Sequence, residues 1–158
     1  MPTELIVFQL DEWRFALPLA VVHEIFHAVR VVPLPSAPAI VLGVIDVRGT
    51  VVPVLDVRVR FGLAHRPAQV NDHFVLATAG ARVVALCVDR ALDLWSVDDR
   101  EMALAARLAP GALLVKGVLQ DAAGLVVVHE LDAFLSSGEE VALGGALEAL
   151  AREGGAST

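Results

Sequence analysis

One stretch of the sequence has the residue types and spacing of a catalytic metal site, because His23-Glu24-Ile25-Phe26-His27 matches the pattern H-E-x-x-H. On a regular helix this pattern places two histidines one turn apart, where they bind zinc, and the glutamate acts as the general base of a metallopeptidase. Here the stretch lies between Pro18 and Pro33 in a segment rich in β-branched valines, which is typical of a strand. On a strand the two imidazoles would be about 13 Å apart. We therefore interpret the match as coincidence, with a small zinc metallopeptidase as the alternative, and predict neither a catalytic nor a metal-binding site.

The single cysteine offers no other catalytic chemistry. Cys87 lies inside the apolar run 83–88, so an intramolecular disulfide is impossible and a buried, inert thiol is expected. No Ser/His/Asp arrangement, phosphate-binding loop or carboxylate pair stands out in the rest of the sequence. The residues indicate a protein that is not an enzyme and needs no cofactor.

Composition narrows the classes of partner. The chain has 158 residues, of which 56% are hydrophobic, enough for a sizeable core. Its net charge is −7 and it has no Lys/Arg cluster, which argues against nucleic acid and anionic membranes as partners. No apolar run reaches the roughly 18 residues that span a bilayer, so we expect no direct membrane insertion and a cytoplasmic location.

The stretch 42–61 is predicted to form two strands joined at Gly49, because glycine accepts a positive φ without steric cost. In its second part, apolar residues occupy the odd-numbered positions and alternate with polar residues such as Asp56 and Arg58. This period of two predicts a strand that continues to residue 61 with one buried face. Pro53 cannot donate to a ladder and is expected at an edge or a bulge.

The pattern of this stretch occurs twice in the chain. The echoed positions are Gly43, Gly49 and Leu55-Asp56 with Gly117, Gly124 and Leu131-Asp132, and Phe15-Ala16-Leu17 with Val84-Ala85-Leu86. Each half contains too few strands to bury a good core alone. The sequence therefore predicts two related all-β halves that share one core and unfold together.

Turn residues place two hairpins. We expect one over residues 5–17 and another around Gly80. Between them, the segment after Pro18 mixes a helical stripe with β-branched residues, and we predict a helical turn followed by a strand from His23.

Capping signals predict three helices. Ser36 is expected to cap a short helix over 38–42, and Asp98 a helix in the second half. Two overlapping Ser-x-x-Glu signals, the first at Ser136, predict a C-terminal helix over 138–152.

Together these segments resemble the CheW family of chemotaxis adaptors over nearly the whole chain. The residues that carry the resemblance are Phe15-Ala16-Leu17, Val22-His23-Glu24-Ile25, Pro35, Pro38, Gly43-Val44-Ile45-Asp46-Val47-Arg48-Gly49, Val52-Pro53-Val54-Leu55-Asp56 and Arg82-Val83-Val84-Ala85-Leu86-Cys87-Val88-Asp89. In combination they are far more specific than any one of them alone.

The resemblance implies a mainly β fold with two pseudo-repeated, five-stranded SH3-like barrels that share a hydrophobic seam, plus short helices and a C-terminal helix. We place the first barrel at about 14–68 and the second at about 69–135 of one domain, completed by strand 5–10 and helix 138–152. The implied function is a non-catalytic scaffold between the cytoplasmic tips of methyl-accepting chemoreceptors and the regulatory domain of a CheA-type histidine kinase, recruited to receptor arrays.

The resemblance also implies two sets of site residues. A groove that binds the receptor is expected at Val22, Ile25, Phe74, Val75 and Leu94. A surface that binds the kinase, or a structural ion pair, is expected at Glu24, Gly43, Asp46, Arg48 and Gly49, with Glu24 and Arg48 forming the pair.

Three residues depart from the family pattern. Asp46 stands where the family commonly has Asn, Val47 where it has Leu, and Arg90 where a glycine usually follows the aspartate of the second half. A changed charge in a contact loop alters which partner is accepted. Flagellar chemotaxis and pilus or developmental signalling both stay open at this point, as does an interaction module with unrelated partners.

Overall fold

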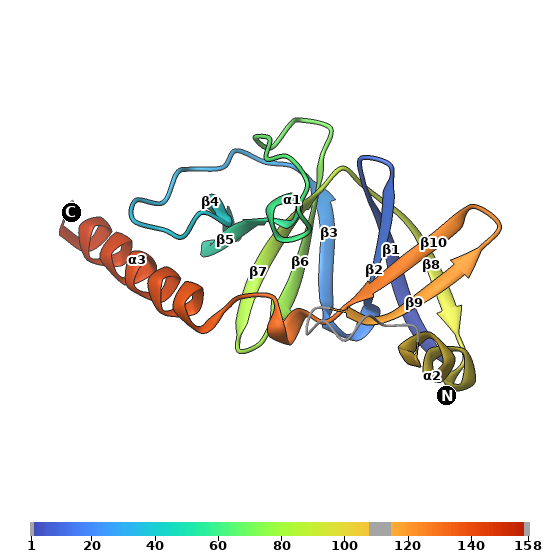
Figure 1. The fold of residues 1–158 in the computed structure, drawn as a ribbon. Helices are drawn as coiled ribbons and strands as arrows, with labels where there is room; N and C mark the ends of the chain where they lie inside the picture. Colours follow the sequence, from blue (N-terminus) through green and yellow to red (C-terminus); the bar gives the residue numbers. More distant parts are fainter. Residues whose placement is uncertain (1, 108–114, 157–158) are drawn as a thin grey trace.

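The computed structural model describes residues 2–107 and 115–156, and within them the strands form two five-stranded sheets that lie side by side (Figure 1). The first sheet has the order β8-β1-β2-β10-β9, with β1 (Thr3–Leu10), β2 (Trp13–Pro18), β8 (Arg90–Val97), β9 (Val115–Asp121) and β10 (Gly124–His129). The second sheet has the order β3-β6-β7-β5-β4, with β3 (Val22–His27), β4 (Val41–Val47), β5 (Thr50–Asp56), β6 (His73–Ala79) and β7 (Arg82–Val88). The mainly β fold class predicted from the sequence is confirmed.

The two sheets repeat one arrangement. In each sheet, the middle strand pairs in parallel with the second strand of a neighbouring hairpin. In the first sheet β2 pairs with β10, where Ala16 lies opposite Val128, and in the second sheet β7 pairs with β5, where Ala85 lies opposite Val54. The remaining pairings within both sheets are antiparallel. The echoed alanines therefore occupy equivalent positions, and the internal repeat is a structural one.

The structure corrects the division between the units. The predicted boundary near residues 68 and 69 would assign β6 and β7 to the second barrel, but β6 pairs with β3 and β7 pairs with β5. The chain begins in the first sheet, builds the whole second sheet, and returns to the first with β8. The second sheet is therefore one continuous stretch of the chain, from β3 to β7, and only the first sheet combines strands from both ends of the sequence.

The hydrophobic seam lies between the sheets. One buried cluster joins Ile6, Phe8 and Phe15 of the first sheet to Leu55 and Leu86 of the second. At roughly 25 cal/mol for each Å² of apolar area, such shared burial is the dominant force that holds the two sheets together. Smaller clusters fill the outer side of each sheet.

Helical segments are short except at the C-terminus. They are η1 (Leu19–Val21), α1 (Val57–Arg60), α2 (Asp99–Arg107), η2 (Leu131–Ala133) and α3 (Ser137–Ala156). The helical turn after Pro18 and the strand that follows it are confirmed by η1 and β3.

Two local predictions around the central hairpin are wrong. Strand β5 stops at Asp56, because that side chain accepts a hydrogen bond from the Arg58 amide (3.1 Å) and begins α1. Residues on both faces of β5 are buried, whereas Val51 is 51% exposed, so the alternation does not mark one buried face. The helix expected over 38–42 is replaced by a single turn before β4, since Ser36 has a left-handed φ of 65° that an N-cap does not adopt. Pro53 lies, as expected, where β5 pairs on one side only.

The predicted C-terminal helix is present and has the expected cap. Glu139 N–H donates to Ser136 Oγ (3.1 Å), and the Ser136 N–H donates to Glu139 Oε1 (2.8 Å), which is a reciprocal capping box. Helix α3 then packs Leu143 and Ala146 against Leu34 and Val44 and extends away from the sheets (Figure 1).

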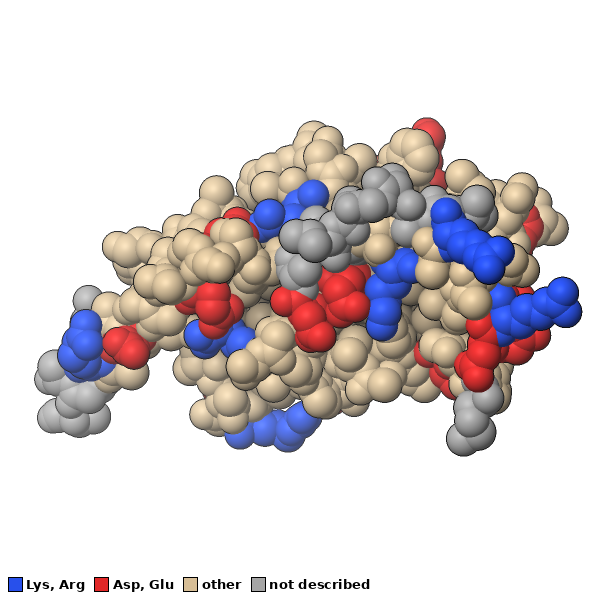
Figure 2. Space-filling model, turned by 60° about the horizontal axis from the view of Figure 1, so that its bottom comes forward, with Lys and Arg blue, Asp and Glu red and all other residues tan. Residues whose placement is uncertain are grey.

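Surface and length give two further observations. On the face shown in Figure 2, basic and acidic side chains of the described residues are interspersed, so this face has no extended positive patch of the kind that nucleic acids select. Among the described helices, none is both long and apolar enough to cross a bilayer.

Candidate functional site

The H-E-x-x-H residues lie on β3 and their side chains have three separate sets of partners. His23 Nε2 is 2.6 Å from Thr78 Oγ1, Glu24 pairs with Arg48, and the His27 ring lies 4.9 Å from that of His73. A strand cannot hold His23 and His27 on one turn as a zinc site requires. The observed strand backbone therefore supports the interpretation of this match as coincidence.

The β4–β5 hairpin ends in a two-residue turn that combines several predicted site residues. Arg48 and Gly49 have φ values of 50° and 87°, the pattern of a type I′ turn. The Gly49 N–H donates to Asp46 Oδ1 at 2.7 Å, which fixes the backbone at the tip. Asp46, Arg48 and Gly49 are all exposed, so the turn presents a defined charged surface to solvent.

The predicted pair between Glu24 and Arg48 is present. Arg48 Nη2 lies 2.8 Å from Glu24 Oε2, and Nη1 lies 3.3 Å from Oε1, so both prongs of the guanidinium are used. Since β3 and β4 are the two edges of the second sheet, the pair connects opposite edges. The hydrogen bond from Arg48 lowers the pKa of Glu24. With 72% of the Arg48 side chain exposed, this is a surface contact.

Gly43 has a structural reason for being glycine. Its φ is 154°, and a Cβ at this position would lie 2.3 Å from the Val32 carbonyl oxygen. The close approach is required by the bridge between Val32 and Val44, whose amides and carbonyls exchange hydrogen bonds of 2.8 and 2.9 Å. Gly43 is buried, and it shapes β4 without presenting a side chain to a partner.

The residues predicted to line a receptor groove divide into two groups. Phe74 and Val75 are fully buried on β6 and belong to the core, so they cannot contact a partner directly. Val22 and Ile25 are partly buried and pack against the cluster of the seam. Leu94 is 61% exposed on β8 and lies opposite Ile6, a member of the same cluster. Thus Val22, Ile25 and Leu94 lie beside the seam cluster and Val75 belongs to it, whereas Phe74 belongs to a separate cluster of the second sheet.

A cluster of charged side chains at the junction of the sheets was missed by the sequence analysis. Arg58 Nη1 lies 2.7 Å from Asp11 Oδ1, and Nη2 contacts Asp89. Arg66 Nη2 contacts Asp89 and Asp72, each at 2.7 Å. We call these five residues the junction cluster. Their distance in sequence hides them, and the only local signal was an arginine inside the apolar alternation of 51–61.

Burial and pairing act in opposite directions on the carboxylates of the junction cluster. Burial raises the pKa of Asp72, but hydrogen bonds from Arg66 and the Gln69 amide lower it further, so the pKa lies below its usual value. Asp89 follows the same pattern, with the Asp11 amide and Arg58 as the main groups that lower its pKa. Both carboxylates are therefore held in the charged form by specific partners.

Histidines and the cysteine also gain partners that the sequence did not reveal. His65 lies with Nδ1 2.5 Å from Oδ2 of the buried Asp56. His129 is only 3% exposed and stacks 3.9 Å from the Phe61 ring. Burial raises the pKa of Cys87 to about 12, which keeps the thiol protonated and unreactive, as predicted.

Comparison with known proteins identifies close similarity to one family. A family model described as a CheW-like domain matches residues 4–139. The chemotaxis protein CheW of Rhizobium meliloti (strain 1021) is 33% identical over 141 residues, which cover 88% of this chain and 91% of that protein. CheW of Klebsiella aerogenes is 28% identical over 144 residues, or 89% and 85% of the two chains. The crystal structure of the scaffolding protein TtCheW from Thermoanaerobacter tengcongensis has the same fold, with a TM-score of 0.77 at 22% identity over 88% of this chain and 96% of that one.

Proposed function

The chain belongs to the CheW-like domain family, and on this premise we propose that it is a non-catalytic adaptor that couples chemoreceptors to a CheA-type histidine kinase. Its place of action would be the cytoplasmic tips of methyl-accepting receptors in their arrays. The zinc metallopeptidase alternative is not favoured, because the H-E-x-x-H residues lie on a strand.

The observation that carries the proposal is the rigid, charged tip of the β4–β5 hairpin. Asp46 fixes the turn from within, and Glu24 holds Arg48 from β3, the edge strand at the opposite side of the sheet. A surface whose side chains are already ordered loses less entropy on binding than a mobile one. We propose that the regulatory domain of the kinase contacts this tip, and that Asp46 contributes to the choice of kinase.

A second surface is proposed for the receptor. Val22, Ile25 and Leu94 are partly or largely exposed around the seam, where an amphipathic helix can bury an apolar stripe. Val75 lies beneath it in the seam cluster, and Phe74 packs in a separate cluster.

The test is reconstitution of kinase control with the purified chain, the CheA-type kinase of the same organism and receptor-containing membranes. Adding the chain should make kinase activity respond to receptor ligand. Arg48→Ala should weaken kinase binding, and Arg152→Ala, at an exposed position on α3, is the matched control. If the kinase neither binds the chain nor responds to it, the chain is an interaction module for unrelated partners.

The receptor surface is tested separately in the same assay. Leu94→Glu and Val22→Glu should lower receptor binding while leaving kinase binding intact, because a charge opposes burial of an apolar stripe. Leu104→Glu, at a residue 51% exposed on α2, controls for adding a charge to the surface. Full receptor binding by both folded variants would remove the seam from the proposal.

A further inference from the structure

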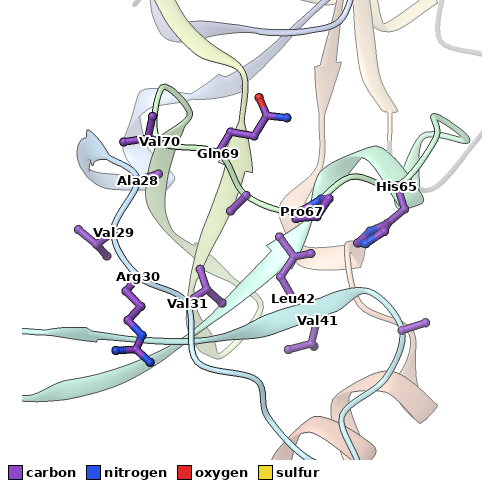
Figure 3. A pocket seen from close by; sticks show the side chains of 12 residues that line it. Ala28, Val29, Arg30, Val31, Val41, Leu42, His65, Pro67, Gln69 and Val70 are labelled. Carbon is purple, nitrogen blue, oxygen red and sulfur yellow. The ribbon is translucent and has the colours of Figure 1, made fainter.

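A groove at the start of β4 has no role in the proposed adaptor function. Its volume is 650 Å³, within the range of about 300–1,000 Å³ typical of ligand pockets. Figure 3 shows two loop segments as its walls, residues 28–31 and 67–70, with Val41 and Leu42 of β4 between them. The groove lies at the start of β4, whereas Arg48 follows the end of that strand.

The walls are loops, but they are firmly held. The carbonyl of Asp72 accepts from Ala28 N–H at 2.9 Å, which ties the first wall, and its carboxylate accepts from Gln69 N–H at 2.8 Å, which ties the second. Asp72 is itself 3% exposed and paired with Arg66. One buried residue therefore holds both sides, so the groove is formed in advance of any ligand.

The lining is apolar where it is exposed. Val29 is 47% exposed and Val70 82% exposed, one from each loop segment. Two large aliphatic side chains left in solvent beside a preformed hollow are what a partner's apolar side chains would cover.

The charge of the lining is opposite in sign to that of the whole chain. Among the described residues that line the groove, Arg30 and His65 alone carry titratable side chains, although the chain carries a net charge of −7. Arg30 is exposed and makes no ion pair within the described part of the chain. Two carboxylates contact residues of the lining, Asp56 at His65 and Asp72 at the Gln69 amide, and both are buried and already paired. The open charge at the rim thus selects for a carboxylate.

Strand β4 adds a backbone feature to the groove. Strand β4 is an edge of its sheet, and outside the sheet it pairs only through the single bridge of Val44 to Val32 among the described residues. An extended segment can add to such an edge, with alternate side chains in pockets. The hollow beside Leu42 is at the free part of this edge.

We propose that this groove binds an extended peptide segment of a partner protein, in which a carboxylate lies next to apolar residues. The apolar residues cover Val29 and Val70, and the carboxylate meets Arg30. This is a docking surface separate from those proposed for kinase and receptor, and it would let the adaptor recruit a further protein.

The experiment is selection of a displayed library of random linear peptides against the full chain, followed by affinity measurement with synthetic copies. The groove variant is Arg30→Glu with Val70→Glu, and the control is Arg152→Glu with Val141→Glu, since Val141 is 75% exposed on α3. Circular dichroism establishes that both variants are folded.

We expect selected peptides to contain Asp or Glu beside apolar residues. They should bind the wild type and the control equally and the groove variant about tenfold or more weakly. Exchanging the carboxylate for an amide should weaken binding, and methyl resonances of Val29, Val41 and Leu42 should shift on binding. Failure to select any peptide, selection of basic peptides, or equal binding to the groove variant would overturn the proposal.

Kinase binding by the groove variant separates this inference from the adaptor function. The variant should bind the kinase as the wild type does, because Arg48 is at the other end of β4. Loss of kinase binding would instead make the groove part of the kinase surface and end the claim of a separate site.

Discussion

Two sets of ion pairs in this molecule use the same chemistry in different surroundings. The pair of Arg48 and Glu24 is at the tip of a hairpin, with 72% and 38% of the side chains exposed. In the junction cluster, 6% of the Arg58 side chain and 4% of the Asp72 side chain are exposed. Both arginines bind carboxylates by short contacts, but the Arg58 side chain is buried and that of Arg48 is largely in solvent, although Asp11 of the junction cluster is also 49% exposed.

This difference in exposure predicts different roles for the two sets of ion pairs, one in assembly with partners and the other in folding. An exposed pair gains little net energy, because water and salt screen it and two long side chains must be ordered. A buried pair is also weak evidence for stability as a whole, but removal of one partner leaves an uncompensated charge inside the protein. The junction cluster is therefore expected to contribute to folding, and the hairpin pair to the binding surface that we propose.

The largest effect is expected from Arg58→Ala. The change removes the buried guanidinium that pairs with Asp11 and Asp89, leaves Asp89 with Arg66 alone, and should lower the free energy of unfolding by up to about 3 kcal/mol. Urea denaturation measures the loss. Arg58→Lys should be less stable than the wild type but more stable than Arg58→Ala, because an ammonium keeps the charge but cannot bind two carboxylates with the planar geometry of a guanidinium.

Arg152→Ala is the control for this prediction and should change stability by no more than about 0.5 kcal/mol. A loss for Arg58→Ala as small as that of the control would show that burial does not distinguish the two sets.

In the wild type, the cluster and the seam join both sheets, so we expect one cooperative unfolding transition. Two calorimetric transitions would contradict the single-domain prediction.

The second largest effect is expected from acid, which should weaken the ion pairs of the junction cluster. The pKa values of Asp72 and Asp89 are lowered in the folded chain, so the unfolded chain binds more protons in acid. Their stabilisation is complete above the ordinary pKa of 3.8 and is lost as the pH falls through the lower folded values. Unfolding free energies measured over this range should fall steeply. In Arg66→Met the fall should be shallower, and an unchanged slope would remove Arg66 as its cause.

A smaller effect at milder pH is expected from His73. Its Nδ1 accepts from the Ala91 N–H at 2.8 Å, which requires the neutral ring. Burial and the positive charges of His27 and Arg90 lower its pKa, and these outweigh Asp72, which raises it. The unfolded histidine gains its proton first, so stability should begin to fall as the pH drops below the ordinary value of 6.5.

The measurement for His73 is the pH dependence of unfolding between neutral and mildly acidic pH, with His73→Asn as the comparison. An asparagine oxygen can also accept from Ala91 but does not titrate, so this part of the slope should disappear. A variant that keeps the full slope would assign it to another group.

The smallest effect on stability is expected at the hairpin tip. Glu24→Ala and Arg48→Ala should leave the unfolding transition nearly unchanged, because both side chains are exposed. Each should weaken kinase binding by about tenfold, and the double variant by little more, since either change frees the other side chain. Strictly additive losses in binding would show two separate contacts, and a large loss of stability would place the pair with the junction cluster.

Local signals in the sequence specified the local elements. Period-two patterns and turn glycines gave the hairpins around Gly49 and Gly80, and the Ser136 capping signal gave the start of α3. The family motifs also indicated the exposed pair of Glu24 and Arg48. These features depend on residues close in the chain, or on motifs that persist in a family.

Only the tertiary structure decided which strands share a sheet and which side chains are buried. The repeat predicted two halves, but pairing of β6 with β3 and of β7 with β5 produced sheets that exchange strands across those halves. For the same reason Phe74 and Val75 became core instead of surface. The contacts of Arg58 with Asp11 and Asp89 join positions up to 47 residues apart, and no local pattern encodes a partner at that distance. Burial is a property of the whole packed chain, so it could be determined only where that packing is known.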